Sequence, residues 1–102
     1  MIIITGIIKV VSKNELDRAK ETLVRRAQRS RKDTGNIEYA FSVNLEDPTE
    51  LRLIEKWENA TALKAHLENS DEEFDAILAT AKIEMASVTS NEVTHESVLM
   101  ER

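Results

Sequence analysis

The chain has 102 residues, of which 41% are hydrophobic and 32% charged, and its formal net charge is −5. This length predicts one domain over residues 1–102 with a modest hydrophobic core. Because nucleic-acid affinity depends largely on Lys and Arg side chains that neutralise phosphates, the acidic balance argues against a general polyanion binder. The chain lacks cysteine, which excludes a disulfide, a thiolate nucleophile and a zinc–thiolate site, and we expect a cytoplasmic protein.

The first eleven residues, MIIITGIIKVV, are apolar on both alternating faces of a strand. No basic residue precedes this run and no small-residue cleavage pattern follows it, and the run is too short to span a bilayer. It therefore predicts a buried strand over residues 2–11 rather than a signal sequence or a membrane anchor. Helices can cover one apolar face, and a second copy of the chain is the simplest cover for the other, so we expect a homodimer.

A long helix is predicted from residue 12 to about residue 32. Ser12 and Glu15 have the spacing of a capping box, and apolar residues then recur at helical spacing at Leu16, Ala19, Leu23 and Ala27. The helix ends in a basic run, which would suit a nucleic-acid patch or a solvated helix end. We favour the solvated end because the run has no interleaved aromatic residue and complements the negative end of the helix dipole: Arg25, Arg26, Arg29, Arg31 and Lys32.

Gly35 is a predicted helix stop, and residues 36–45 and 51–57 are predicted as an antiparallel hairpin joined by a turn at residues 46–49. Tyr39 and Phe41 share one face of the first strand of this hairpin. They could form the wall of a pocket or simply fill the core, and the usual burial of aromatic residues favours the core.

The stretch Leu51 to Leu67 carries the most unusual pattern in the chain. Glu55 and Trp57 lie on one largely apolar strand face, and Asn59 then caps a short helix that carries His66. A glutamate on such a face is expected where the face lines a cavity with polar groups. A single tryptophan or histidine is also common in an ordinary core or on a surface, so both interpretations stay open.

The rest of the chain is predicted to form a helix and a broken strand. Ser70 and Glu73 have capping-box spacing and begin a helix that contains Phe74. Strand propensity returns from about residue 83, with a break at Ser90 and Asn91 and a last strand over residues 93–100 that could pair with a partner subunit. His95 lies in this last strand and has no assigned role. The element order predicts a ferredoxin-like α+β fold, an antiparallel sheet with helices on one face.

Two short segments and one aromatic residue resemble the signature of the antibiotic biosynthesis monooxygenase (ABM) family, particularly its quinol monooxygenase members. These are residues 54–59 (IEKWEN), residues 62–67 (ALKAHL) and Phe74. The resemblance implies a dimeric α/β barrel in which two open sheets pack face to face. It also implies oxidation of an electron-rich aromatic substrate, such as a quinol or a phenol, by molecular oxygen without metal, flavin or haem.

The implied chemistry needs a base that removes a phenolic proton, so that the resulting anion can itself reduce oxygen. On this resemblance, His66 is expected to be the base and Glu55 to orient it or to hold a water molecule. The pocket for a small aromatic substrate is then expected to be formed by four aromatic side chains: Trp57, Tyr39, Phe74 and Phe41.

The chain also departs from relatives of this family. Many relatives carry a second histidine after the short helix, where this chain has residues 70–72 (SDE). Haem-degrading relatives use an asparagine, a tryptophan and a histidine where the nearest residues here are Ile7 or Ile8, His66 and Leu78, so haem degradation is not expected. Two alternatives stay open, a small-ligand binding protein without catalysis and an isomerase of a small polar metabolite. A dry pocket would favour aromatic substrates, and a wet one around Glu55 and His66 would favour sugars.

Overall fold

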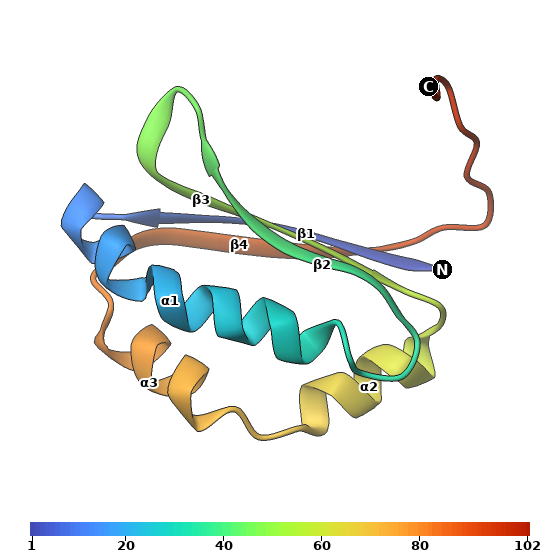
Figure 1. Ribbon diagram of the computed structural model, residues 1–102, viewed down its shortest axis with the longest axis horizontal. Helices are drawn as coiled ribbons and strands as arrows, with labels where there is room; N and C mark the ends of the chain where they lie inside the picture. Colours follow the sequence, from blue (N-terminus) through green and yellow to red (C-terminus); the bar gives the residue numbers. More distant parts are fainter.

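A four-stranded antiparallel sheet carries all three helices on one face (Figure 1). The structure is a computed structural model that describes residues 1–102. Its elements follow the predicted order and confirm the ferredoxin-like α+β fold, with strand order β2-β3-β1-β4. Their bounds are β1 Ile2–Val10, α1 Lys13–Ser30, β2 Asn36–Asn44, β3 Asp47–Trp57, α2 Ala60–Glu68, α3 Glu72–Thr80 and β4 Ile83–Glu92.

The central strand β1 pairs with β3 on one side and β4 on the other. Its alternating side chains divide between the two faces of the sheet, and Ile2, Ile4 and Val10 are buried beneath the helices. Ile3 and Ile7 point to the opposite face, which no helix covers. We call this side of the sheet the open face.

The helix α1 lies along the sheet and buries the stripe predicted from its spacing, Leu16, Ala19, Leu23 and Ala27. The predicted capping box is wrong, because Ser12 occupies the N-cap position but makes no side-chain cap hydrogen bond. The carboxylate of Glu15 instead pairs with the Arg18 side chain, at 2.9 Å, and does not reach back to the cap. None of the three helices combines the length and the apolar character that crossing a bilayer requires.

The β2–β3 hairpin turns more tightly than predicted. Strand β3 already begins at Asp47, within the predicted turn, because Asn44 pairs with Asp47 across the hairpin. The Asp47 carboxylate also accepts hydrogen bonds from the backbone N–H and the hydroxyl of Thr49, at 2.9 and 2.7 Å. Gly35, the predicted helix stop, has a φ of +82° and leads from α1 into β2.

The caps of the two short helices were predicted with different success. The Asn59 side chain accepts a hydrogen bond from the backbone N–H of Ala62 at 2.9 Å, which confirms it as the cap of α2. The predicted cap of α3 at Ser70 is wrong by one residue. Asp71 is the N-cap, and its carboxylate accepts from the backbone N–H of Phe74 at 3.1 Å.

Strand β4 runs without the break predicted at residues 90 and 91, and the last strand predicted over residues 93–100 is absent. Residues 93–102, the C-terminal segment, leave the sheet and rise on the side away from the helices (Figure 1). Backbone hydrogen bonds between Met1 and Val93 and an ion pair between Lys56 and Glu96 hold the beginning of the segment. Because β1 begins at Ile2, no strand of the same chain remains for residues beyond 93 to pair with.

Candidate functional site

The stretch from β3 into α2 gathers three side chains whose proximity was predicted. Glu55 and Trp57 follow one another on the helix-facing side of β3, and they are only 6% and 0% exposed. The Trp57 Nε1–H donates to Glu55 Oε1 at 2.9 Å. His66 on α2 is 2% exposed, and its ring lies against the indole with the ring centroids 4.5 Å apart. The glutamate, the indole and the imidazole therefore form one buried group.

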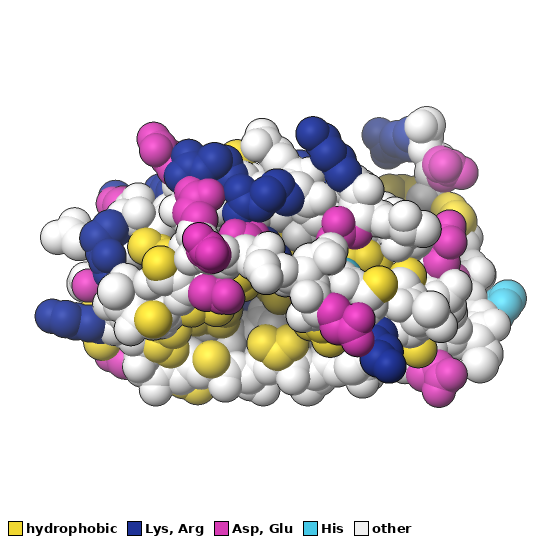
Figure 2. Space-filling model, turned by 90° about the horizontal axis from the view of Figure 1, so that it is seen from below, with side chains coloured by type: hydrophobic (Ala, Val, Ile, Leu, Met, Phe, Trp, Pro, Cys, Tyr) yellow, Lys and Arg dark blue, Asp and Glu magenta, His cyan; other side chains and the backbone are white.

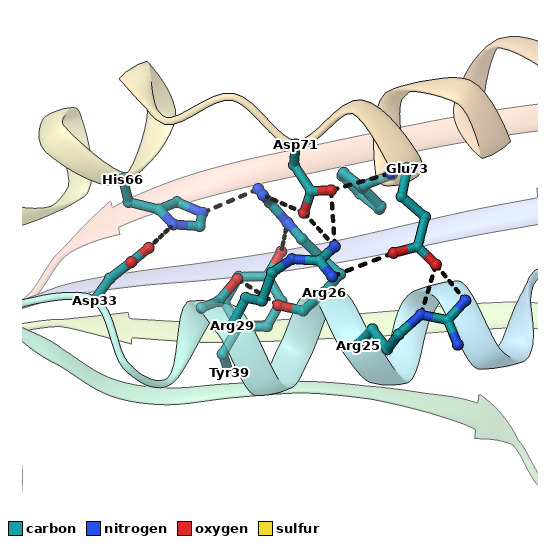
Figure 3. Close-up of polar contacts among 10 residues, drawn as sticks. Arg25, Arg26, Arg29, Asp33, Tyr39, His66, Asp71 and Glu73 are labelled. Carbon is teal, nitrogen blue, oxygen red and sulfur yellow. Dashed lines mark hydrogen bonds and ion pairs between the residues drawn. The ribbon is translucent and has the colours of Figure 1, made fainter.

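Both ring nitrogens of His66 have partners (Figure 3). The Nδ1 atom lies 2.7 Å from Asp33 Oδ2, in the loop after α1, and the Nε2 atom lies 3.1 Å from an NH2 group of Arg26. The Asp33 carboxylate can only accept a hydrogen bond, so Nδ1 carries the proton. The Nε2 lone pair then accepts from the Arg26 guanidinium.

The resemblance implied that Glu55 orients His66 or holds a water molecule, and no hydrogen bond joins Glu55 to His66. Asp33 orients the imidazole, whereas the Glu55 carboxylate bonds to the indole of Trp57. Trp57 thus contacts both groups. The two acid–base side chains share an aromatic neighbour but have different polar partners.

Arg26 is the polar centre of this region. Its side chain is 13% exposed, and its Nε–H donates to the Tyr39 hydroxyl at 3.3 Å while NH1 donates to Asp71 Oδ2 at 3.2 Å. The guanidinium carbon lies 4.6 Å from the centre of the Phe74 ring, within the range of a cation–π contact. Burial lowers the pKa of Arg26, but its hydrogen bonds to Tyr39 and Asp71 outweigh that effect and raise the pKa above its ordinary value.

The hydroxyl of Tyr39 is held in its neutral form. Burial raises the pKa of Tyr39, and the nearby negative charge of Glu55 raises it further, against an opposing effect from Arg26. The ring is 2% exposed and packs edge-to-face with Phe41 at 5.6 Å between centroids. Tyr39 therefore belongs to the core, the more expected of its two interpretations, and still places a hydroxyl beside Arg26.

Three arginines of the basic run at the end of α1 belong to an interhelical ion network, so the predicted solvated helix end is wrong for Arg25, Arg26 and Arg29. Arg31 and Lys32 are exposed and make no ion pair, as that prediction expects. Arg29 NH2 donates to both carboxylate oxygens of Asp71 at 2.7 Å, and its NH1 donates to Glu73 at 3.2 Å. Arg25 also pairs with Glu73. Figure 2 shows basic and acidic side chains next to one another on this side of the molecule. The network joins α1 to the first turn of α3.

Asp71 is the acid through which this network reaches the buried group. Burial raises the pKa of its carboxyl, but hydrogen bonds from Arg29, from the backbone N–H of Phe74 and from Arg26 outweigh that effect and lower the pKa. The carboxylate therefore stays ionised between the two guanidinium groups. It fixes the position of Arg26, which in turn faces His66 Nε2.

Two cavities near these residues differ in character. A polar cavity of about 240 Å³ reaches His66 from outside, and it is lined by Lys32, Asp33, Thr34, Ala62, Ala65, His66 and Asn69. An apolar cavity of about 230 Å³ lies between α1 and β2, and Phe41 is part of its wall. Glu55 and Trp57 line neither of these cavities, so the cavity predicted beside Glu55 is not found at either place.

Sequence reasoning missed the partners of His66, which are Arg26 and Asp33, and the anchor of Arg26 at Asp71. One signal could have indicated Arg26: it stands three residues after Leu23 and four before Ser30, both of which are buried on α1. An arginine on the edge of a buried helical stripe needs a carboxylate or other acceptor nearby. No group of three or more His, Asp or Glu side chains is arranged to hold a metal ion.

Comparisons with known proteins agree on one family. The model of the family described as antibiotic biosynthesis monooxygenase matches residues 1–82. A protein from Deinococcus radiodurans assigned to the antibiotic biosynthesis monooxygenases has a similar structure, with a TM-score of 0.85 and 22% identity over 99% of this chain and 100% of its own. A protein from Nitrosomonas europaea with the same assignment has a TM-score of 0.75 and 18% identity over 91% of this chain and 99% of its own.

A third solved structure has a less specific description. It is a conserved protein of unknown function from Bacteroides thetaiotaomicron, described as a possible oxidoreductase, with a TM-score of 0.74 and 20% identity over 90% of this chain and 96% of its own. At these identities the solved structures show a shared fold. No curated protein gives a significant match.

Proposed function

Because the chain belongs to the antibiotic biosynthesis monooxygenase family, we propose that it oxidises a quinol-like or phenolic aromatic substrate with molecular oxygen. The observation that carries the proposal is the arrangement Asp33–His66–Arg26, in which a buried imidazole lies between two partly buried side chains and beside the indole of Trp57. It places a neutral imidazole and a cation next to each other among aromatic side chains. Proton removal from a phenol requires a base and a group that stabilises the resulting anion.

His66 is the proposed base. A phenolic oxygen that enters between His66 Nε2 and the Arg26 guanidinium, now 3.1 Å apart, donates its proton to Nε2. The phenolate then accepts a hydrogen bond from Arg26, and Asp33 stabilises the imidazolium through Nδ1. Arg26 must move away from Nε2 for this step, which its contacts with Asp71 and Tyr39 oppose.

The substrate supplies the electrons in this proposal, so no metal, flavin or haem takes part. For a phenol with hydrogen on the para carbon, that carbon gains one atom of O₂ as a carbonyl oxygen. The second oxygen atom leaves as water with the phenolic hydrogen and the ring hydrogen, and the product is a quinone. The four electrons that reduce O₂ all come from the aromatic ring.

Glu55 and the aromatic side chains have supporting parts in the proposal. Glu55 is a nearly buried carboxylate whose one side-chain hydrogen bond comes from Trp57, so it is a second proton acceptor close to the site. Four aromatic side chains are proposed to contact the substrate and to keep water from the anion, which strengthens its interaction with Arg26: Trp57, Tyr39, Phe74 and Phe41.

Oxygen uptake measured against a panel of quinols and phenols tests the proposal. We expect turnover with at least one of them, and a loss of about a hundredfold or more in kcat for His66→Gln, the usual range for a general base. Glu55→Gln is expected to lose activity as well. His95→Gln is the matched control, because His95 is the other histidine and is exposed in the C-terminal segment. Full oxygen uptake by folded His66→Gln and Glu55→Gln variants would contradict the assignment.

The polar cavity beside His66 favours a second candidate function, an isomerase or another acid–base enzyme acting on a small polar metabolite. The cavity presents Lys32, Thr34 and Asn69 next to the Asp33–His66 pair, and these groups suit hydroxyl-rich ligands better than a bare aromatic ring. Deuterium incorporation from D₂O into a ketose or aldose, without oxygen consumption, would support this function. Saturable binding with neither activity would instead indicate a binding protein.

We also propose that the chain forms a homodimer through its open face, as in a dimeric α/β barrel. Ile3, Ile7 and Ile54 lie on this face without a helix above them. The C-terminal segment rises from the same side and exposes 98% of Leu99 and 78% of Met100. Packing two open faces together would bury these apolar side chains. Sedimentation should show a dimer at micromolar concentration, and a monomer there would contradict the proposal.

A further inference from the structure

A second concave surface lies on the other flank of α1, away from His66. One stripe of the helix and the edge strand β2 enclose an apolar cavity of about 230 Å³. The cavity includes none of Glu55, Trp57 or His66. Its walls are Leu16, Lys20, Leu23, Val24, Ala27, Arg31, Phe41, Ser42, Val43 and Leu51.

The cavity has a buried floor and an exposed apolar rim. Leu23, Ala27 and Leu51 form part of the floor and are buried. Val24 on α1 and Val43 on β2 are 55% and 39% exposed at the rim, so the apolar interior is open to solvent. A cavity of about 150 Å³ accepts benzene and drug-sized ligands occupy roughly 300 Å³ or more, which makes this volume suitable for two fused rings.

The charges around this cavity are positive, although the chain as a whole is acidic. No acidic residue lines it. The Lys20 ammonium is neutralised by Asp17 at 2.9 Å, but Arg31 makes no ion pair. Its Nε–H donates to the backbone oxygen of Tyr39 at 3.0 Å, which holds the guanidinium at the cavity and leaves both terminal nitrogens free.

Arg31 differs in this respect from the other arginines at the end of α1. Arg25, Arg26 and Arg29 all pair with the N-cap acid or a first-turn acid of α3, whereas Arg31 faces β2. A guanidinium with two free terminal nitrogens matches a carboxylate in geometry and charge. A cation anchored beside an open apolar cavity is thus complementary to a ligand with an apolar body and one negative end.

We propose that the α1–β2 cavity binds a bicyclic aromatic monocarboxylate, with its rings against Phe41 and Val24 and its carboxylate on Arg31. This inference is independent of the oxygenase proposal, because it concerns another cavity, which shares only Phe41 with the proposed substrate contacts, and a binding measurement. The competing occupant is the apolar C-terminal segment of a second copy, and the test below distinguishes the two.

The test compares 2-naphthoate with 2-naphthamide, a neutral ligand of nearly the same shape. Titration calorimetry should show that the chain binds 2-naphthoate about tenfold more tightly, the effect of one charge-assisted contact at a half-exposed site. Arg31→Gln should remove this preference and leave the affinity for 2-naphthamide unchanged, and Arg31→Lys should retain part of it. Lys64→Gln is the matched control, since Lys64 is an exposed cation on α2 without an ion pair.

A second variant tests the place of binding. Val24→Trp puts a large ring across the rim from an exposed position, so it should abolish binding of both ligands without unfolding the chain. The proposal is overturned if Arg31→Gln binds 2-naphthoate as tightly as the unmodified chain, or if a folded Val24→Trp variant still binds both ligands. It is also overturned if affinity falls as the chain self-associates, since a second copy would then occupy the cavity.

Discussion

Asp71 offers the most direct test of how the site is held together. Its side chain is 7% exposed and accepts hydrogen bonds from Arg29, from Arg26 and from the backbone N–H of Phe74. Asp71→Ala removes both the cap of α3 and the acid of the interhelical network. Asp71→Asn keeps an oxygen that can cap the helix but removes the negative charge. The pair of variants therefore separates the cap from the ion pairs.

The expected losses follow from these contacts. Loss of an N-cap costs about 1 kcal/mol. Removing one partner of a buried ion pair costs about 3–5 kcal/mol, and we take the lower end or less because Arg29 is half exposed. We therefore expect about 3 kcal/mol for Asp71→Ala and about 2 kcal/mol for Asp71→Asn, which correspond to falls in Tm of roughly 12–24 °C and 8–16 °C. Asn59→Ala, which removes only the α2 cap, should cost about 1 kcal/mol.

The lowered pKa of Asp71 also determines how its contribution to stability changes with pH. Because the pKa of Asp71 is lower in the folded chain than in the unfolded chain, its contribution to stability is complete above the unfolded value of about 3.9. The contribution is lost as the pH falls through the folded pKa. Urea unfolding at fixed protein concentration should therefore show a gap between the unmodified chain and Asp71→Asn that is full at pH 7 and shrinks below about pH 4. An Asp71→Asn variant that loses no more than Asn59→Ala at pH 7, or a gap independent of pH, would refute the reasoning.

Three further predictions concern other parts of the molecule. Tyr39 is the only tyrosine, so ultraviolet titration should show its hydroxyl ionising above the ordinary pKa. Glu55→Gln should lower the pKa of Tyr39, and an unchanged titration curve would contradict the role of the Glu55 charge. Gly35→Ala should destabilise the chain by about 1–3 kcal/mol in urea unfolding because φ is +82°, and Gly6→Ala, which has a negative φ, should cost less. Leu99→Asp should weaken self-association in sedimentation while leaving thermal unfolding of the monomer unchanged.

The sequence predicts the fold well wherever the spacing of apolar residues within one helix or strand shows which face is buried. The alternation in β1 and the spacing of Leu16, Leu23 and Ala27 follow directly from which face is covered. The errors occur where the outcome depends on a partner that the pattern of the predicted element does not reveal. Glu15 pairs with Arg18 instead of completing the predicted capping box, and the residues predicted as a last strand have no neighbouring strand in their own chain.

The same distinction explains what could be predicted of the site. Glu55, Trp57 and His66 lie within one strand, one turn and one short helix, so local geometry is enough to bring them together. The partners of His66 are 33 and 40 residues away in the sequence, at Asp33 and Arg26. Such pairs depend on how α1 and α2 pack on the sheet, which no spacing along one element reveals. For the same reason, the sequence does not reveal that Arg25, Arg26 and Arg29 pair with acids at the start of α3.

Arg26 contributes both to the stability of the fold and to the proposed reaction. The guanidinium that faces His66 Nε2 is the same group that Asp71 holds at the start of α3, so a change at the helix cap should reach the proposed base through one side chain. If Arg26 must leave Nε2 for a phenol to bind, weakening its anchor should help substrate entry while it destabilises the fold. Asp71→Asn should then lower KM for the best quinol, although Tm falls. A rise in KM without a change in kcat would instead show that Asp71 is needed to keep Arg26 in place for the substrate anion.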